Sequence, residues 1–459
     1  MRAGVAAGHP STAEAGVATL RAGGSAVDAA VAMMLVSCAA ETIFTGLSGG
    51  GFATVVDAAS GEVTCVDFFV AVPGLDGTSP GSGTAIEVTF VGQQIPYEIG
   101  PATVAVPGVP AGAHHLWRRW GRLPWDEVVA PGLQASYGTP LPRTHADLLP
   151  VIAPAMCVGD GLQVYCRPDG TLLRAGDRLQ HRDHHHAYHL LAEDPDAFYR
   201  GAYAEALVAA VADGGAISAD DLAAYRVRES EPRQVEFDHF RVHARGDDLD
   251  DLLGTLERVA HQVPGDPTTD PASALGLVDA LRGLDRRAET TNVVAVDGDG
   301  NACALTTSLG LGSGVWVPGY GVHLNSMLGE GELIRNALDP GARMGSMMSP
   351  LVALDSDARP VAAAGAAGGS RIRPALLQVL VRMLRGAAPQ DAIDAPRLNA
   401  LPNLVRTEPG FSPEVLAALG RGSRVAVAAG RDPYFGGVSA ISTRGGGADP
   451  RRDGSVALL

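Results

Sequence analysis

The pattern of apolar residues changes at Thr290, and this change restricts the fold more than any other feature. Residues 290–297 (TTNVVAVD) and 301–309 (NACALTTSL) are rich in strand-forming side chains and are separated by a Gly-Asp-Gly turn. Two such runs joined by a short glycine-containing turn predict a β-hairpin. Short strands and then a helix are expected further along: residues 315–317, 322–324 and 351–354, then Pro374–Leu384.

The chain before Thr290 has a mostly helical pattern. Capping-box patterns at Ser11–Glu14 and Ser25–Asp28 each predict the start of a helix. The mostly apolar run Ala29–Ala40 is 12 residues long, so it predicts a buried helix and is too short to span a bilayer. Residues 247–270 are acidic and are expected to form a loop. Helices followed by strands predict a layered α/β protein whose sheets are covered by helices.

The charged residues exclude several kinds of function. All 35 basic residues are arginine, so chemistry that needs a lysine, such as a P-loop or a Schiff base, is excluded. The formal charge is −16 with no basic stripe, so we expect no nucleic-acid partner, and no membrane partner is expected either. Aromatic residues make up only 5% of the chain while alanine is abundant, which predicts a core packed from small side chains.

The cysteines and histidines give no indication of a metal or a disulfide scaffold. There are five cysteines, an odd number, and none lies in a Cys-x-x-Cys pair or at zinc-finger spacing. The run His184–His186 is expected to lie on a solvated helix face, because three consecutive histidines on a helix cannot all face one ion. No apolar signal segment precedes the first expected helix. We therefore predict a cytoplasmic protein with no metal and no cofactor.

Two glycine-rich segments are candidates for a functional role. Gly46-Leu-Ser-Gly-Gly50 matches the nucleophile elbow, but that motif needs a strand before it and a helix after it, and here the order is reversed. A glycine turn that lets backbone approach another strand or a ligand is the better interpretation. Gly368 and Gly369 lie between an expected strand and an expected helix. They form either an ordinary turn or a pair of N–H groups aimed at a developing oxyanion.

Thr290 is a candidate nucleophile only under one condition. A threonine hydroxyl without a neighbouring base is a poor nucleophile at pH 7. If the chain is cut directly before Thr290, the freed α-amino group has a pKa of about 7.7–8.0 and can act as the base. The alternative is an ordinary threonine at the start of a strand.

Motifs along most of the chain resemble those of one known family. The first group lies before residue 60 and the denser group lies after residue 290, at residues 8–16, 20–31, 49–52, 290–291, 299–302, 324–325, 348–350, 368–372 and 394–397. In type and order they resemble the motifs of the γ-glutamyltranspeptidases, which are N-terminal-nucleophile hydrolases.

The resemblance implies a fold and an activity. It implies a four-layer αββα sandwich, one domain built from a large-subunit region, 1–289, and a small-subunit region, 290–459. It also implies that the chain cleaves itself before Thr290 and that the two fragments stay associated. Thr290 is then expected to attack a small-molecule γ-glutamyl amide and to pass the acyl group to water, an amino acid or a peptide.

The resemblance also implies roles for six further residues. By the resemblance, Gly368 and Gly369 form the oxyanion hole, and Ser308 supports the nucleophile. Three residues are expected to contact the substrate: Glu330 at the α-amino group, Ser346 near the α-carboxylate, and Asn325.

This chain departs from the family pattern at several of its positions. The second threonine is followed by Asn292 instead of histidine, Gly310 replaces an asparagine, and Met347 replaces a serine. The arginine that grips the α-carboxylate in the large subunit has no counterpart. These departures motivate two alternatives. One is an acylase of the same fold acting on glutaryl or cephalosporin-type amides, and the other is an uncleaved, non-catalytic relative.

Overall fold

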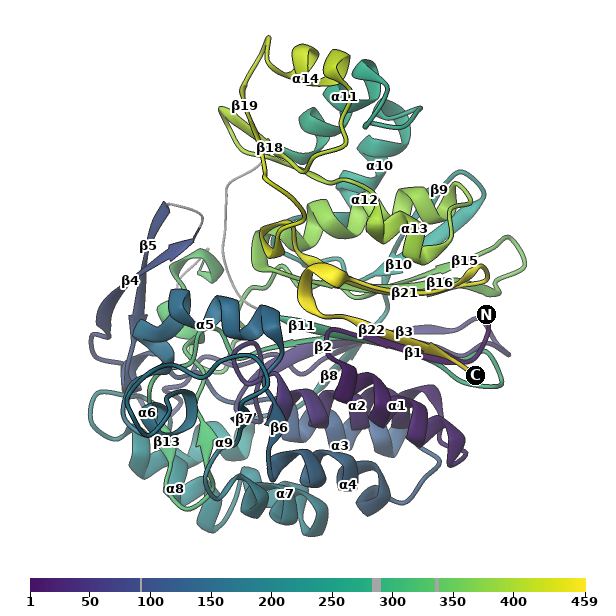
Figure 1. Cartoon of the computed structure of the whole chain (residues 1–459). Helices are drawn as coiled ribbons and strands as arrows, with labels where there is room; N and C mark the ends of the chain where they lie inside the picture. Colours follow the sequence, from purple (N-terminus) through teal and green to yellow (C-terminus); the bar gives the residue numbers. More distant parts are fainter. Residues whose placement is uncertain (91–92, 283–289, 335–337) are drawn as a thin grey trace.

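Two stacked β-sheets form the centre of the computed structural model, which describes residues 1–90, 93–282, 290–334 and 338–459 (Figure 1). The first sheet has seven strands in the order β22-β1-β11-β12-β2-β3-β8, and the second has six in the order β21-β20-β16-β15-β10-β9. Neighbouring strands in both sheets are antiparallel. Their bounds are β1 Gly4–Ala7, β2 Gly50–Val56, β3 Val63–Asp67, β8 Arg228–Ser230, β9 Arg233–Phe237, β10 Phe240–Ala244, β11 Thr291–Val296, β12 Ala302–Ser308, β15 Leu351–Leu354, β16 Pro360–Ala367, β20 Gly437–Ser442, β21 Gly445–Ala448 and β22 Ser455–Leu458.

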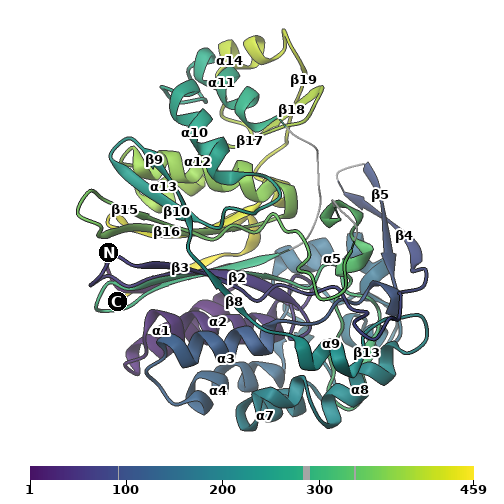
Figure 2. The ribbon, with the colours of Figure 1, turned by 180° about the vertical axis from the view of Figure 1, so that it is seen from behind.

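Helices cover the outer face of each sheet. The fully buried helix α2 (Ala26–Ala40) packs on β11 and β12, whereas α12 (Ile372–Leu384) packs on β16 and β20. Figures 1 and 2 show the resulting order of helices, sheet, sheet and helices, so the prediction of an αββα sandwich is confirmed. The other helices of these two layers are α1 Pro10–Arg21, α3 Val109–Trp120, α4 Trp125–Ser136 and α7 His184–Glu193, and α10 Leu252–Gln262, α11 Pro271–Leu281, α13 Pro389–Asp394 and α14 Pro413–Leu419.

The strands of the two expected subunit regions are interleaved within both sheets. In the first sheet, β11 pairs with β1, and β12 pairs with β2. In the second sheet, β10 pairs with β15. Each sheet is therefore completed only by strands from both sides of residue 290.

The remaining elements extend the sandwich at two sides. One group includes the β4–β5 hairpin and the helices that follow it, and another is a small three-stranded sheet beside α11 and α14 (Figure 1). Their bounds are β4 Thr84–Phe90, β5 Gln93–Ile99, α5 Arg143–Met156, β6 Thr139–Pro140, α6 Gly161–Tyr165, β7 Arg178–Leu179, α8 Ala202–Val211, α9 Ala219–Ala224, β13 Trp316–Val317, β14 Val322–His323, β17 Leu398–Ala400, β18 Leu404–Thr407 and β19 Arg424–Val427. Within the ranges that the structure describes, no helix is both long and apolar enough to cross a membrane.

The interface between the two sheets is built from small side chains, as the composition predicts. Alanines and valines from both sheets fill it, with Ala6, Val294 and Ala304 facing Ala363 and Ile441. Small side chains let two sheets approach closely while still excluding water.

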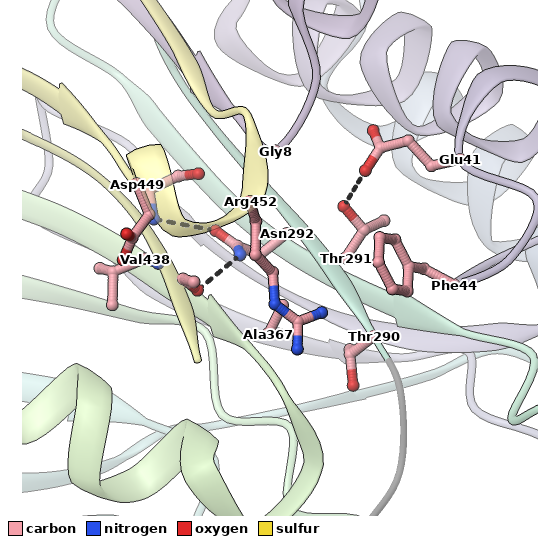
Figure 3. Close-up of a pocket in the computed structure, with 12 residues that line it drawn as sticks. Gly8, Glu41, Phe44, Thr290, Thr291, Asn292, Ala367, Val438, Asp449 and Arg452 are labelled. Atoms are coloured by element: carbon pink, nitrogen blue, oxygen red, sulfur yellow. Dashed lines mark hydrogen bonds between the residues drawn. The ribbon is translucent and has the colours of Figure 1, made fainter. Parts of the chain in front are cut away.

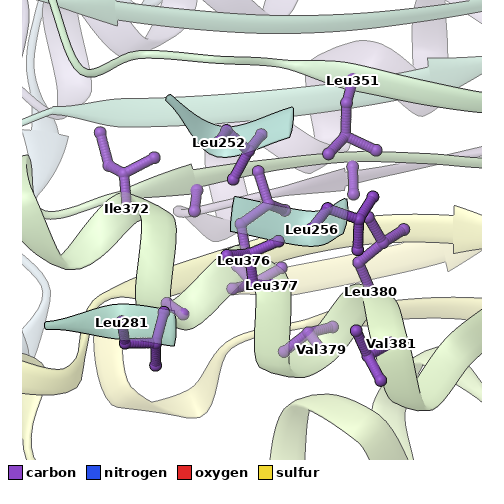
Figure 4. Packing of buried hydrophobic residues seen from close by; sticks show 14 of the residues in the cluster. Leu252, Leu256, Leu281, Leu351, Ile372, Leu376, Leu377, Val379, Leu380 and Val381 are labelled. Atoms are coloured by element: carbon purple, nitrogen blue, oxygen red, sulfur yellow. The ribbon is translucent and has the colours of Figure 1, made fainter. Parts of the chain in front are cut away.

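The core behind the second sheet contains larger side chains. Leucines of α12 pack against Leu252 and Leu256 of α10 and against Leu351 of β15 (Figure 4). The expectation of a loop over 247–270 is therefore wrong, because α10 lies within that range. Acidic residues flank this helix, but its apolar face is buried, and this burial outweighs the loop-like composition.

Local sequence signals gave mixed results at helix starts. Ser25 and Asp28 form the predicted capping box of α2. At α1 the predicted helix forms, but Ser11 does not cap it, because His9 is the cap and its Nδ1 accepts from the backbone N–H of Ser11. The histidine run is also not uniformly solvated, since His184 is buried.

Candidate active site

Thr290 lies directly before β11, a central strand of the seven-stranded sheet, and only 1% of its surface is exposed. It lines a small cavity. Figure 3 shows this cavity between the helix layer, the head of β11 and the C-terminal segment. Its lining residues are Gly8, Glu41, Phe44, Thr290, Thr291, Asn292, Ala367, Gly437, Val438, Ser439, Asp449 and Arg452.

The residue after Thr290 is fixed from the helix side. The Thr291 hydroxyl donates to Oε2 of Glu41 at 2.6 Å (Figure 3). The Thr12 hydroxyl donates to Oε1 of the same carboxyl at 2.8 Å. Burial raises the pKa of the Glu41 carboxyl, while the hydrogen bonds from Thr291 and Thr12 and the charge of Arg452 oppose that rise.

Asn292 fixes the strand from the opposite face. Its Nδ2 donates to the carbonyl of Gly437 at 3.3 Å, and its Oδ1 accepts from the N–H of Ser439 at 3.2 Å. Both partners belong to β20 of the second sheet. The asparagine that replaces the family's histidine therefore ties the two sheets together beside the cavity.

Ser308 lies at the end of β12, the strand next to β11. Thr291 pairs with Thr307, so the same antiparallel register, continued by one residue, brings Thr290 opposite Ser308. Directly opposed residues have Cβ atoms about 4.5–5.5 Å apart. The Ser308 hydroxyl also accepts from the N–H of Gly310 at 3.0 Å. This placement fits the predicted supporting role of Ser308.

The glycine pair follows β16, whose last residue, Ala367, lines the cavity. Gly368 and Gly369 have φ values of +123° and +58°, which disfavour other residues. A Cβ atom on Gly368 would lie 3.4 Å from an Nη atom of Arg452. The glycine turn leads from β16 into α12 beside the cavity, and the oxyanion role of the pair stays a prediction.

The three predicted substrate-binding residues lie in different surroundings. The Asn325 side chain bonds only to backbone among the described residues: it accepts from the N–H groups of Ala105 and Met327 and donates to two carbonyls. Asn325 is thus suited to holding loops in place. The Ser346 hydroxyl accepts from the N–H of Met348 within its own loop.

Glu330 is buried beside Gly310, one of the positions where this chain departs from the family. A Cβ on Gly310 would lie 2.3 Å from Oε1 of Glu330, and Gly310 has a φ of +73°. Any side chain at 310 would displace the carboxylate. Gly310, two residues after Ser308, therefore makes the buried position of Glu330 possible.

Arg452 and Glu41 were not predicted from the sequence. Arg452 is 6% exposed, and its guanidinium carbon lies 5.0 Å from the centre of the Phe44 ring. Figure 3 shows its side chain reaching toward the head of β11, where Thr290 lies. The one available signal was the acidic Glu41 placed directly after the long apolar run. Arg452 gave no signal, because only the fold brings the C-terminal segment to residue 290.

The glycine turn before β2 was predicted correctly. A Cβ on Gly49 would lie 2.3 Å from the carbonyl oxygen of Ser308, and a Cβ on Gly51 would lie 2.3 Å from that of Thr306. These glycines allow β2 to lie close against β12. The turn helps to fix the strand that carries Ser308.

Comparisons with known proteins agree with this architecture. The chain matches the family model described as Gamma-glutamyltranspeptidase over residues 12–247 and 256–459. It is 28% identical to the acylase ACY 1 proenzyme of Pseudomonas sp. (strain SE83), over 99% of this chain and 93% of that protein. It is 26% identical to the glutathione hydrolase proenzyme of Bacillus subtilis (strain 168), over 98% of this chain and 90% of that protein.

A solved structure shares the fold. The cephalosporin acylase from Bacillus halodurans aligns with a TM-score of 0.81 at 24% identity, covering 100% of this chain and 96% of that one. The four-layer sandwich is the fold of the N-terminal-nucleophile hydrolases. Because the family model covers nearly the whole length, the chain belongs to the gamma-glutamyltranspeptidase family. Its relatives carry the names of hydrolases and acylases, which makes it a member of an enzyme family.

Proposed function

We propose that the chain cleaves itself before Thr290 and then uses Thr290 to cleave γ-glutamyl amides. The observation that carries this proposal is the burial of Thr290 at the head of a central strand, in a cavity lined also by Ala367 and Arg452. A buried hydroxyl beside a glycine turn and a cation is arranged for attack on a carbonyl.

Self-cleavage uses the Thr290 hydroxyl as nucleophile and consumes one water molecule. The Oγ atom attacks the carbonyl carbon of the preceding residue, the C–N bond breaks as the Thr290 nitrogen takes up the hydroxyl proton, and an ester forms. Water then hydrolyses the ester, which restores the hydroxyl and leaves a free α-amino group on Thr290.

The cleaved chain can then turn over substrate. The free amino group takes the hydroxyl proton as Oγ attacks the amide, and the N–H groups of Gly368 and Gly369 stabilise the oxyanion. The departing amine takes up that proton, leaving an acyl ester on Thr290. Water or an acceptor amine then attacks the ester and frees Thr290.

The interleaved sheets support lasting association of the two regions, 1–289 and 290–459. After cleavage, β11 remains paired with β1, β12 with β2, and β10 with β15. We therefore propose one domain made of two fragments. The cytoplasmic location stays a prediction.

Arg452 supports an acyl group that ends in a carboxylate. Among the described residues that line the cavity, it is the one that carries a positive charge. A guanidinium can bind a carboxylate with two parallel hydrogen bonds. Arg452 is thus a candidate for the task of the arginine that the large-subunit region lacks.

N-terminal sequencing of the purified protein tests this proposal. From the chain's 47.1 kDa, fragments of 289 and 170 residues should run near 30 and 17 kDa, the smaller one beginning at Thr290. Thr290→Ala should remain one chain. A wild-type chain that stays intact would instead support the uncleaved, non-catalytic relative.

A second candidate is an acylase for glutaryl or related amides. The position of Glu330 favours it, because Glu330 does not line this cavity among the described residues. A glutaryl group lacks the α-amino group that Glu330 is predicted to hold. Turnover of γ-glutamyl-p-nitroanilide and of its glutaryl analogue should be compared directly, and preference for the second would reassign the substrate.

A further inference from the structure

Three separate segments meet at the Glu41 carboxyl. Glu41 caps the end of α2, Thr12 comes from α1, and Thr291 begins β11. All three residues are buried. The carboxyl thus connects the helix layer to the strand that carries the candidate nucleophile.

The hydrogen bond between Glu41 and Thr291 is closely covered. A Cβ atom on Gly8 would lie 3.2 Å both from Oε2 of Glu41 and from Oγ1 of Thr291. Gly8 therefore leaves no room for a side chain beside the two bonded oxygens, which belong to buried residues. A hydrogen bond screened from water in this way is stronger and more directional than one on the surface.

The geometry of a strand connects this bond to Thr290. Successive side chains of a strand point to opposite faces, so Thr291 faces the helices while Thr290 and Asn292 face the second sheet. Asn292 is held by β20, and Thr291 is held by Glu41. The backbone just after Thr290 is therefore clamped from both faces.

We propose that Glu41 is a positioning residue, which through Thr291 fixes the direction of the Thr290 hydroxyl and of its freed amino group. The inference rests on the proposed role of Thr290 as nucleophile. Small errors in the direction of an attacking group have large effects on rate, so loss of the clamp should reduce kcat more than it raises KM.

The test compares Thr291→Val, Thr291→Ser and Thr12→Val in the full chain. Thr291→Val keeps the side-chain shape and loses the bond. We expect it to lower kcat and the rate of self-cleavage about 10- to 100-fold, with KM within about threefold of wild type. Thr291→Ser, which keeps the hydroxyl, should recover kcat to within about threefold.

Thr12→Val is the matched control, because it removes the other hydrogen bond to the same carboxyl, on the side away from β11. It should lower the melting temperature about as much as Thr291→Val but reduce kcat less than about threefold. Equal losses of kcat in the two variants would overturn the inference, because the carboxyl would then act only through stability. Wild-type kcat in Thr291→Val would overturn it as well.

Two further measurements keep the outcome decisive. If Thr291→Val does not fold, Glu41→Gln replaces it, with an expected loss of kcat of about tenfold, and an unchanged kcat overturns the inference. An uncut wild-type chain, or an active Thr290→Ala, contradicts the proposed function itself, and the inference fails with it. If only the proposed role of Glu41 is wrong, the wild-type chain is still cut before Thr290, and Thr290→Ala is still inactive.

Discussion

Arg451 and Arg452 are neighbours in the sequence and are both buried, yet they serve different parts of the molecule. The Arg451 guanidinium forms two hydrogen bonds with Glu408 and one with Asp449. Asp449 in turn pairs with Arg397 at 2.6 Å. We call these four residues the ion network. Arg452 instead lies over Phe44 and lines the cavity with Thr290.

The difference shows that burial of an arginine does not by itself indicate its role. Burial alone would raise the pKa of Asp449, but Arg397 and Arg451 hold it below its ordinary value. The network is therefore charged and internally paired, and it fastens the C-terminal segment. Arg452 follows directly in this fastened C-terminal segment, and its side chain lines the cavity. Variants of the cavity should change turnover, and variants of the network should change stability.

The largest effect is expected at Thr290. Thr290→Ala should lower the turnover of γ-glutamyl-p-nitroanilide by at least about a thousandfold, because the attacking oxygen is gone. The melting temperature of this variant, which remains uncut, should stay within a few degrees of that of the wild-type chain before cleavage. Thr290→Ser, which keeps a hydroxyl, should retain measurable turnover. Equal activity in the alanine and serine variants would remove Thr290 from the chemistry.

A large loss of stability is expected from breaking the ion network. Arg451→Gln leaves Glu408 buried without its main partner, and removing one member of a buried pair costs about 3–5 kcal/mol. Urea unfolding measures this loss. KM of the folded fraction should change less than about threefold. If Arg451→Gln unfolds like wild type, the network does not fasten the C-terminal segment.

A smaller and more specific effect is expected at Arg452. Arg452→Gln should raise KM about 10- to 100-fold for glutaryl- and γ-glutamyl-p-nitroanilide, since a carboxylate contact is lost. Pentanoyl-p-nitroanilide, with the same chain length and no carboxylate, is the matched substrate and should be affected far less. Equal losses for all three substrates would show that Arg452 does not bind the acyl carboxylate.

The last prediction concerns pH and a single titrating residue, His9. Burial lowers the pKa of His9 from 6.5 to about 4, so between these values the unfolded chain binds a proton that the folded chain does not. Stability therefore falls as pH drops from 6.5 toward 4, by up to about 3 kcal/mol for this residue at 1.36 kcal/mol per pKa unit.

His9→Asn separates this contribution from that of the network. Asparagine can cap a helix but does not titrate in this range, so the variant should lose less stability between pH 6.5 and 4. Asp449 of the network, whose pKa is lowered, begins to lose its contribution only below its ordinary value of 3.8. Urea unfolding over pH 4–7 measures the difference. Identical slopes for the variant and the wild type would contradict the assignment to His9.

The sequence predicted those features that depend on nearby residues. The hairpin after Thr290, the capping box at Ser25 and the glycine approach of Gly49 are local signals, and the structure has all three. The four layers were expected from a resemblance. The position of Thr290 directly before β11, beside Ser308 at the end of the adjacent strand β12, agrees with it.

The rest depends on contacts between residues far apart in the chain. Glu41 and Thr291 are 250 positions apart, so no local pattern connects them. α10 was missed because the acidic residues around it resemble a loop, while the apolar surface that buries it comes mainly from α11 and β9. The sequence could not distinguish the role of Arg452 from that of Arg451, because each role depends on side chains that only the fold brings near.

Neither sheet can be finished by one half of the chain, since each needs strands that lie on both sides of residue 290. The surroundings that would activate a newly exposed amino end come into existence only when the whole polypeptide has assembled. Cleavage before residue 290 would then occur only in correctly folded molecules, and a misfolded molecule would remain uncut and inactive.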